Sequence, residues 1–205
     1  SEESNKRLEY AGLQLVGERM EQILNRLKQK IEVGSIIEQR ADLYFITVQE
    51  EQIELVLSYL KQQENFTHLA FLQAVDFIED NKFQLTYMLY NYDIKVNLGI
   101  KVFIDREKSE MTSTHKLWAH AWQYQRELKE MYGIDFPGSP KVDESFVLEG
   151  WEEIPPMKRE FDTLAYSEKT FYQRPGRSSN DPKEYMKEKL NKNFPQSTKE
   201  GRKDD

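Results

Sequence analysis

The sequence predicts an α+β fold in which helices pack on one face of a mainly antiparallel sheet, followed by an irregular C-terminal extension. Three observations lead to this prediction. Apolar residues recur at three- and four-residue steps early in the chain, alternate with polar residues in the middle, and lose regularity beyond Phe136. The first spacing is typical of amphipathic helices and the second of half-buried strands. Helices combined with hairpin-linked strands favour an α+β sandwich.

Two amphipathic helices are expected in the first third of the chain. Residues 16–33 carry an apolar stripe, and Gly34 follows it at the position of a C-terminal cap. Residues 50–62 again place their apolar side chains on one helix face. Residues 1–14 are polar, so we expect them to form a flexible N-terminal segment before an α+β domain over 15–136.

Several short segments have the composition or the alternation of strands. The last two are separated by so short a link, around 91–93, that they must form an antiparallel hairpin. A crossover to a parallel strand would need many more residues. The predicted strands are 35–39, 43–48, 69–75, 83–92 and 94–104.

A third helix is expected over residues 114–132. Ser113 or Thr114 can cap its start, and Gly133 is placed to end it in a left-handed conformation, with Ile134 packing back. Residues 137–171 are broken by Pro and Gly yet rich in apolar side chains, which predicts an extension that lies on its own domain or on a neighbouring subunit. The charged tail, 172–205, is expected to be disordered or to wrap a partner.

Composition excludes several classes of function. The net charge of −7 argues against a general nucleic-acid binder, because phosphate affinity needs clustered Lys and Arg. The chain has no cysteine, so it can form no disulfide, no Cys-type zinc site and no Cys-ligated iron–sulfur cluster of its own. No apolar run approaches the roughly 20 residues that span a bilayer, and the first residues lack the pattern of a signal peptide.

Histidines and nucleotide motifs give little sign of catalysis. His115 and His120 stand five apart on the predicted helix, whereas a helical metal pair normally stands four apart. His68 has no acidic residue or histidine near it at metal-ligand spacing. No phosphate loop, Gly-x-Gly-x-x-Gly or Gly-x-Ser-x-Gly motif occurs, so nucleotide binding and α/β-hydrolase chemistry have no support.

Two other patterns have an ordinary and a functional interpretation. The pair Glu152-Glu153 could act as glycosidase carboxylates, but a solvated charged surface is the simpler interpretation. Trp118 and Trp122, four apart, could stack on a cofactor, although a core or interface stripe is favoured. We therefore identify no catalytic, cofactor-binding or metal-binding residue in this chain.

Residues 121–136 run from an alanine and aromatic residues through the pair Arg126-Glu127 to the acid Glu130, an aromatic, and then Gly133, Ile134 and Phe136. This pattern resembles the signature of the C subunit of complex I, the proton-pumping NADH–quinone oxidoreductase. The resemblance extends over roughly 15–161, since later residues match the family's tryptophan, proline, basic pair and aromatic: Trp151, Pro156, Lys158, Arg159 and Phe161.

The spacing of Arg126 and Glu130 predicts an ion pair along the helix. Arg126 would keep other donors free for a partner carboxylate, and Glu127 would point elsewhere, toward an arginine of the next subunit. The alternative is an ordinary surface ion pair of little energetic weight.

The chain departs from the family pattern at several positions. The family's Gly-His-Pro is Gly138-Ser139-Pro140 here, and Gln125 stands where the family usually has an acid. The following Asp-Leu-Arg-Arg is replaced by the segment 141–144, Lys-Val-Asp-Glu, which reverses the charge. These changes favour a divergent branch, such as the corresponding subunit of membrane-bound energy-converting [NiFe] hydrogenases or of related ferredoxin-dependent complexes.

The resemblance implies a cofactor-free structural subunit of the peripheral arm of a membrane-bound, ion-pumping oxidoreductase. It implies a hetero-oligomer on the cytoplasmic side, in which the chain packs on the large catalytic subunit, either the D type of complex I or the hydrogenase type. Iron–sulfur subunits would lie in the same arm, with iron–sulfur clusters or a NiFe centre in these partners, and membrane subunits would be contacted indirectly. The residues expected at the partner interface are Trp122, Arg126, Glu127, Glu130, Tyr132, Gly133, Phe136, Trp151, Pro156, Lys158, Arg159 and Phe161.

Other functions stay open at this point. The chain could be the corresponding subunit of the standard NADH–quinone oxidoreductase rather than of a hydrogenase or ferredoxin-dependent relative. It could also be a free-standing α+β binding module, which would purify alone, or a small hydrolase, which would need a concave carboxylate pair with a raised pKa.

Overall fold

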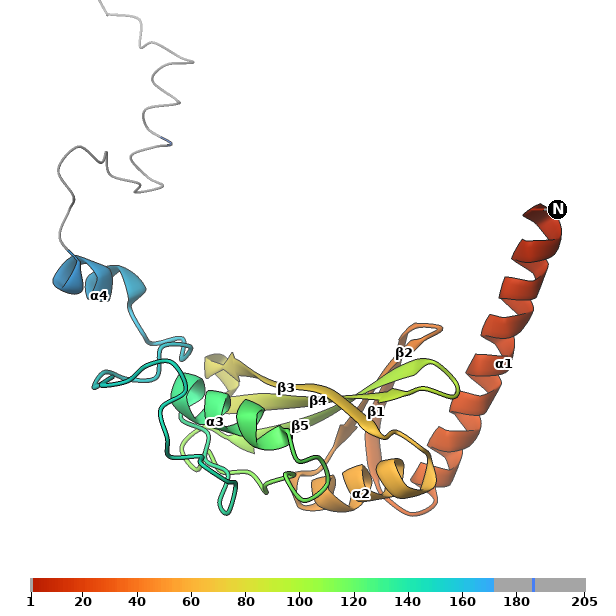
Figure 1. Cartoon of the computed structure of the whole chain (residues 1–205), viewed down its shortest axis with the longest axis horizontal. Coiled ribbons are helices and arrows are strands. Elements are labelled where there is room, and N and C mark those ends of the chain that lie inside the picture. Colours follow the sequence, from red (N-terminus) through yellow and green to blue (C-terminus); the bar gives the residue numbers. More distant parts are fainter. Residues whose placement is uncertain (1, 172–185, 187–205) are drawn as a thin grey trace, which may run out of the picture. The chain divides into compact units, whose positions relative to one another are not determined.

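The computed structural model describes residues 2–171 and residue 186 of the chain (Figure 1). Two compact units divide the chain, Ser1–Asp162 and Thr163–Asp205. The first unit holds the whole sheet, and the second begins with the short helix α4 (Thr163–Thr170). The charged tail expected over 172–205 lies outside the described residues, apart from Met186.

Five strands form one sheet in the order β1-β2-β5-β4-β3. Neighbouring strands run antiparallel except β2 and β5, which pair in parallel, since α2, β3 and β4 lie between them along the chain. The predicted α+β class is confirmed, as is the hairpin that links β4 to β5. The strands are β1 (Val33–Arg40), β2 (Leu43–Val48), β3 (His68–Phe77), β4 (Lys82–Asn91) and β5 (Val96–Asp105).

Helices cover one face of this sheet. In Figure 1, α2 (Ile53–Gln63) and α3 (Ala121–Tyr132) lie on the same side of the strands. The 3-10 turns η1 (Glu50–Gln52) and η2 (Ile78–Asp80) precede α2 and follow β3. The last turns of α1 (Glu2–Lys28) share the same core.

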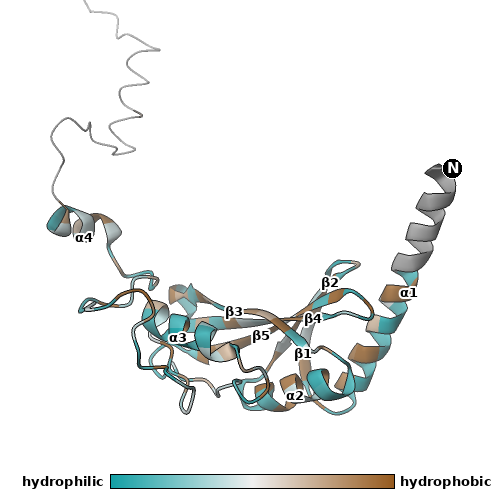
Figure 2. Ribbon diagram, viewed as in Figure 1, coloured by the Kyte–Doolittle hydropathy of each residue, from teal (hydrophilic) through white to brown (hydrophobic). Residues whose placement is uncertain are grey.

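The core lies between these helices and the inward face of the sheet. Alternate residues of the strands point toward the helices, and Figure 2 shows hydrophobic and hydrophilic stretches alternating along α1 and the strands. Burying each such Leu, Ile or Phe contributes about 1.5–3 kcal/mol. Fully or almost fully buried core residues include Met20, Leu27, Ile46, Val56, Leu57, Leu60, Phe83, Leu85, Tyr87, Leu89, Leu98, Ile100 and Val102.

The first helix differs from its predicted bounds at both ends. It begins at Glu2, so residues that we expected in a flexible segment stand in a helix. It ends at Lys28 rather than at Gly34, which lies in β1 instead of capping the helix. The reason is strand pairing, because β1 joins β2 from Val33 onward and draws the chain out of the helical conformation.

The prediction of a helix over 114–132 is wrong in its first third. Helix α3 begins at Ala121, and turns fill the segment before it, so Ser113 and Thr114 cap no helix. The indole of Trp118 is buried and donates to the carbonyl of Thr67, 2.8 Å away, ahead of β3. This tertiary contact holds the segment against the sheet.

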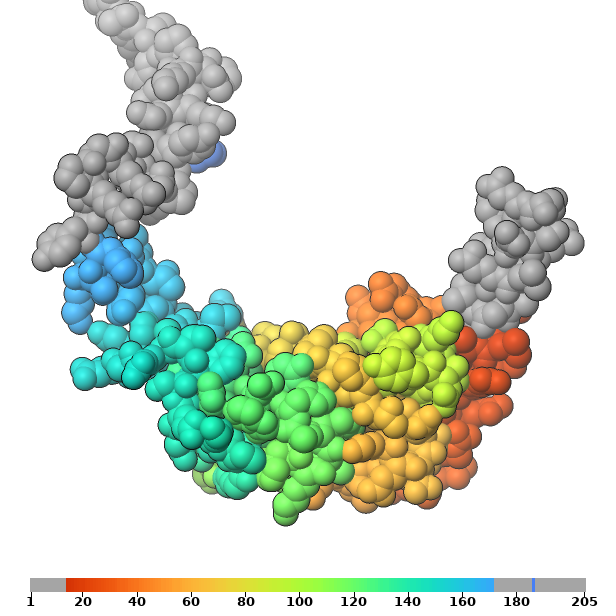
Figure 3. All heavy atoms as spheres, viewed as in Figure 1, coloured from red at the N-terminus to blue at the C-terminus, as the bar shows by residue number. Residues whose placement is uncertain are grey.

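Beyond Phe136 the first unit contains no helix or strand up to residue 162, as expected for the extension. In Figure 3 the atoms of this extension, in teal and cyan, lie directly against those around α3. The prediction of irregular structure up to residue 171 is wrong for α4, which starts the second unit. We use "extension" below for residues 137–162.

Candidate functional site

The site predicted from the sequence centres on α3 and its C-terminal end. Gly133 ends the helix with a φ of 76°, and its N–H donates to the carbonyl of Lys129. A Cβ at Gly133 would also lie only 3.3 Å from Pro155 of the extension. Glycine is thus favoured by the left-handed conformation, and a larger residue would also press on the extension. The residues after it, Ile134 and Phe136, are buried in the core.

Glu130 holds one part of the extension by its backbone. Its carboxylate accepts hydrogen bonds from the amides of Phe146, Val147 and Leu148, at 2.7, 2.9 and 3.1 Å. Hydrogen bonds to a charged acceptor are stronger than neutral ones, so three on one carboxylate fix the loop firmly. We call this contact the Glu130 attachment.

Arg126 lies one helical turn before Glu130 and contacts the same loop. Its guanidinium stacks on the rings of Trp122 and Phe146, with centroids at 5.6 and 5.2 Å, and lies 4.0 Å from the carboxylate of Glu144. Its Nε is buried without a hydrogen-bond partner among the described residues. The predicted Arg126–Glu130 ion pair is therefore wrong, because both side chains turn to the extension instead.

A second set of charges holds the far part of the extension. The buried carboxylate of Asp76, at the end of β3, accepts from Arg106 at 2.7 and 3.0 Å and from the amide of Arg159 at 2.9 Å. Arg106 also pairs with Glu160, and the Arg159 guanidinium pairs with Glu79. We call this network the Asp76 attachment.

Burial and hydrogen bonding act on Asp76 in opposite directions. Burial disfavours the charged carboxylate, but the hydrogen bonds from Arg106 and from the Arg159 amide outweigh it. The pKa of Asp76 therefore lies below its ordinary value, and the carboxylate is ionised at neutral pH.

Lys129 adds a third link between α3 and the chain beyond it. Its ammonium pairs with Asp135 at 2.7 Å and with Asp143. Burial works against the charge, yet the two carboxylates outweigh it and raise the pKa of Lys129 above its ordinary value. The hydrogen bond from Lys129 is also the main reason that the pKa of Asp135 is lowered.

A neutral polar network joins α3 to the turn at Gly138-Ser139-Pro140. Gln125 is fully buried, and its Oε1 accepts from Ser139 Oγ at 2.6 Å and from Ser113 Oγ at 2.7 Å. Its Nε2 donates to Thr114 Oγ1 at 3.3 Å. Two of the positions at which the chain departs from the family pattern, Gln125 and Ser139, are thus in direct contact.

The other predicted residues lie on α3 or on the extension packed against it. The rings of Trp151 and Phe161 contact each other at 5.5 Å, and the Lys158 ammonium lies 5.9 Å from the centre of the Phe83 ring. Tyr132 packs edge-on against Phe83. Glu127 and Pro156 are partly exposed, whereas Phe136 is fully buried and so acts through the core.

Sequence reasoning missed Asp76 and Arg106, and it did not place Phe146 and Val147 among the interface residues although the extension was recognised as apolar. The signal for Asp76 was available, since its position in β3 faces inward, where an acid requires a partner. No local pattern could name its partners, because Arg106 lies 30 residues and Arg159 lies 83 residues away along the chain.

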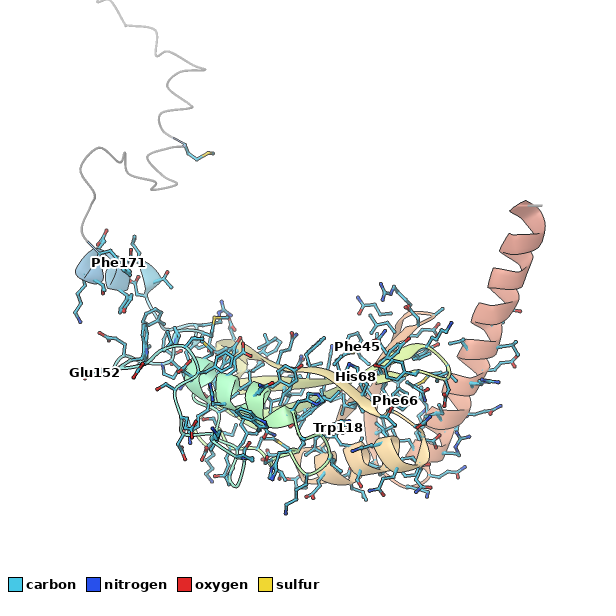
Figure 4. The ribbon with its side chains drawn as sticks, in the orientation of Figure 1. Phe45, Phe66, His68, Trp118, Glu152 and Phe171 are labelled. Carbon is cyan, nitrogen blue, oxygen red and sulfur yellow. The ribbon has the colours of Figure 1, made fainter. Side chains whose placement is uncertain are left out.

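The histidines and tryptophans play structural parts in this unit. His120 precedes α3, and its ring contacts the Leu69 carbonyl at 2.9 Å, while His115 lies in the preceding turn beside Ser113. In Figure 4, Trp118 and His68 lie where the turns before α3 meet the start of β3. Among residues 2–171 and 186, no three His, Asp or Glu side chains lie close enough to hold a metal ion.

No described helix is long and apolar enough to cross a membrane. With the fold and these contacts established, the chain can be compared with known proteins. The sequence model of the family described as respiratory-chain NADH dehydrogenase, 30 Kd subunit, matches residues 46–167. The chain belongs to this family. The resemblance seen in residues 121–136 is confirmed, and the chain is a C-type subunit of an NADH–quinone oxidoreductase-like complex.

Relatives of this C-type subunit occur in complexes with different electron donors. The chain is 32% identical over 121 residues to the C subunit of NADH-quinone oxidoreductase from Moorella thermoacetica, covering 59% of this chain and 79% of that protein. It is 30% identical over 95 residues to the C subunit of F(420)H(2) dehydrogenase from Methanosarcina mazei, covering 46% and 60%. It is 27% identical over 147 residues to the C/D subunit of NADH-quinone oxidoreductase from Hydrogenobaculum sp., covering 71% of this chain but 25% of that protein.

Solved structures share the fold of this C-type subunit. A chain of the membrane-bound sulfane sulfur reductase, an archaeal respiratory membrane complex, matches with a TM-score of 0.68 at 22% identity, over 78% of this chain and 96% of that chain. A trypsin-resistant fragment of Nqo5 matches with a TM-score of 0.53 at 20% identity, over 60% and 98%. Both comparisons show the same α+β architecture.

Proposed function

We propose that this chain is a structural subunit, without a redox centre of its own, of the peripheral arm of a membrane-bound, ion-pumping oxidoreductase. It packs on the large catalytic subunit through α3 and the extension. In that position it holds the large subunit in the geometry needed for electron transfer and carries no electrons itself.

The observation that carries this proposal is an ordered loop with outward apolar side chains. The exposed fractions are 36% for Phe146, 65% for Val147, 44% for Ile154 and 54% for Met157. All four belong to residues 146–157 of the extension, and exposed apolar patches mark sites of protein interaction. Because the Glu130 attachment fixes the loop through its backbone, the side chain of Val147 is left to face a partner, while the Phe146 ring packs on Arg126 and stays partly exposed.

Relatives named as joint C/D subunits support the large subunit as that partner. In Hydrogenobaculum sp. and in Aquifex aeolicus, related proteins carry the joint name C/D, and the chain matches 25% and 19% of their lengths. A polypeptide that contains both parts keeps them at a high effective concentration, which is of use only where they act together. We therefore place the D-type subunit against α3.

The donor set of the chain supports a role without redox centres. It has no cysteine to ligate an iron–sulfur cluster. We place the clusters in neighbouring iron–sulfur subunits, and the contact with the membrane, on its cytoplasmic side, in other subunits of the complex.

Two branches of the family fit this role. In one the complex is an NADH–quinone oxidoreductase, and in the other it is a hydrogenase or a ferredoxin-dependent relative. The contact between Gln125 and Ser139, at two positions where the family pattern is changed together, favours the divergent branch. Nickel in the purified complex would decide for the hydrogenase.

The test is purification of the tagged chain from its native membranes in mild detergent, with mass spectrometry of the subunits and metal analysis. We expect a D-type large subunit and iron–sulfur subunits to accompany the wild-type chain. A Val147→Asp variant should lose most of the large subunit, because a carboxylate would be buried at the interface.

The matched control is Leu55→Asp, which places the same charge at a residue 59% exposed on α2, away from the extension. It should retain the large subunit. Recovery of the wild-type chain alone, without metal, would refute the proposal and leave a free-standing α+β binding module.

A further inference from the structure

The face of the sheet opposite the helices carries apolar side chains on both sides of a polar row at its centre. The strand register places one set of side chains on this face, from β2, β5, β4 and β3. Phe103 and Val75 are 40% and 39% exposed there, although they are large apolar residues. We call the central part of this surface the open sheet face; it comprises Phe45, Thr47, Phe71, Gln73, Val75, Gln84, Thr86, Met88, Gly99, Lys101 and Phe103.

Its composition differs from the rest of the chain. Charged residues make up 32% of the sequence, yet Lys101 is the one charged residue of the open sheet face, and the next charges on the same side, Lys82 and Asp105, lie at the strand ends. The other ten residues are three phenylalanines, a valine, a methionine, a glycine and four uncharged polar residues. Depletion of charge with enrichment in aromatic residues and Met is typical of the centre of a protein interface.

The surface is flat because of Gly99. A Cβ at this position would collide with the Phe45 ring and lie 3.3 Å from Met88 Cε, so the ring rests on the glycine backbone. The ammonium of Lys101 lies 4.5 Å from the centre of the same ring. In Figure 4 Phe45 is labelled beside β2, on the side away from α2. A glycine on the central strand thus provides an even platform without a projecting side chain.

The area fits the centre of an interface. The open sheet face takes in at most five residues of each of four strands. With about 3.3 Å per residue and about 4.8 Å between strands, it presents about 300 Å² in projection. A standard interface buries about 800 Å² on each partner, so the occupant would also contact residues around this face.

Lys101 indicates what the occupant carries. It lies near the middle of the central strand and forms no ion pair with any residue that the structure describes. If two copies of the chain paired face to face about a two-fold axis, Lys101 would approach its own copy and leave both charges unpaired. A different protein with a carboxylate at this point would pair the charge as it covers the apolar surroundings.

We infer that the open sheet face binds a second subunit of the complex, through a flat apolar surface that carries a carboxylate opposite Lys101. The inference rests on the proposed function, since it needs the multisubunit complex, but it goes beyond that function. The chain then bridges two subunits, with the large subunit on α3 and the extension and another on the opposite face of the sheet.

The absence of cysteine in the chain allows a site-specific test. Phe103→Cys and, separately, Val147→Cys are each labelled with a thiol-reactive photocrosslinker in the assembled complex from native membranes. We expect the Val147 position to crosslink to the large subunit and the Phe103 position to a different subunit. A crosslink from Phe103 to a second copy, to residues 172–205 of the same chain or to the large subunit would overturn the inference, as would no crosslink at all.

Charge reversal gives the complementary measurement. Lys101→Glu should reduce recovery of the second subunit at least tenfold and leave recovery of the large subunit unchanged. Replacing the crosslinked partner's acid by Lys should restore it. Lys28→Glu, on the exposed side of α1, is the control and should change neither recovery. Equal recovery of all subunits with Lys101→Glu would overturn the inference. Loss of the large subunit by the wild type would instead refute the proposed function.

Discussion

Two of the contacts that hold the extension to the domain differ in burial. At the Asp76 attachment the side chain of Asp76 is 2% exposed and that of Arg106 is 13% exposed. At the Glu130 attachment the amides that donate belong to residues of an exposed loop, and Val147 is 65% exposed. Both attachments depend on a charged carboxylate. That of Asp76 is enclosed by protein, whereas that of Glu130 binds a loop at the surface.

This difference separates stability from recognition. Breaking a buried ion pair strongly destabilises the fold, because removal of one partner leaves the other charge buried and unpaired. A contact at the surface is weaker and can adjust when another protein replaces the solvent. We therefore expect the Asp76 attachment to keep the extension on the domain and the Glu130 attachment to shape the surface that a partner meets.

The largest effect should come from Asp76→Ala. It leaves the Arg106 guanidinium without its main partner, and we expect a loss of about 3 kcal/mol or more in the free energy of unfolding. Chemical denaturation of the purified chain measures this loss. Asp80→Ala, an exposed acid just after β3, is the control and should cost less than about 0.5 kcal/mol. Similar values for the two variants would contradict the comparison.

Acid should remove the stability that the ionised Asp76 carboxylate contributes. The pKa of Asp76 is lowered on folding, so the carboxylate stabilises the protein above the unfolded value of about 3.9 and loses this effect as the pH falls through its folded value. The free energy of unfolding of the wild type minus that of Asp76→Asn should be greatest near neutral pH and shrink below about pH 4. Denaturation curves between pH 3 and 7 give this difference, and a constant one would exclude Asp76 as the titrating group.

Glu130→Gln should have a smaller and more local effect. The three amide hydrogen bonds lose their charged acceptor, which we expect to cost about 1–2 kcal/mol. Hydrogen exchange at Phe146, Val147 and Leu148 should speed up, while exchange in β4 and β5 stays slow. Glu127→Gln is the control on the same helix and should leave the exchange unchanged. Uniformly faster exchange across the domain would show that the two attachments do not differ as described.

The last variant, Arg126→Glu, should act on assembly more than on stability. Its two ring contacts contribute about 0.5–1 kcal/mol each at a partly exposed site, and the new carboxylate would repel Glu144. Recovery of the complex should fall by a larger factor than the folded fraction does, because the loop that carries Phe146 is displaced. An unchanged yield of the complex would show that this part of α3 does not determine assembly.

Alternation and helical periodicity were enough to predict the sheet and α2. Residues 83–92 and 94–104 were predicted within two residues of β4 and β5, since inward positions are filled by large apolar side chains. The helix before Ala121 could not be excluded by periodicity, because Leu117 and Trp118 fit a helix as well as a turn. The turn forms in place of a helix because Trp118 donates to the carbonyl of Thr67, which is distant in the sequence.

The residues of the candidate site were predicted better than their contacts. Four-residue spacing correctly places Arg126 and Glu130 on one side of α3, but a spacing rule compares only the two side chains with each other. Glu130 instead accepts hydrogen bonds from the amides of a loop that begins 16 residues later in the sequence. The family pattern named residues for the interface, and only the fold shows which of them hold the chain itself.

The Gln125 network limits how this sequence can change. Gln125 and Ser139 share a hydrogen bond in the core, so an acid at position 125 alone would bring an uncompensated charge between hydroxyl groups. A histidine at position 139 alone would have to fit where a hydroxymethyl group now lies. Changes at positions 125 and 139 should therefore be tolerated best when both residues change together.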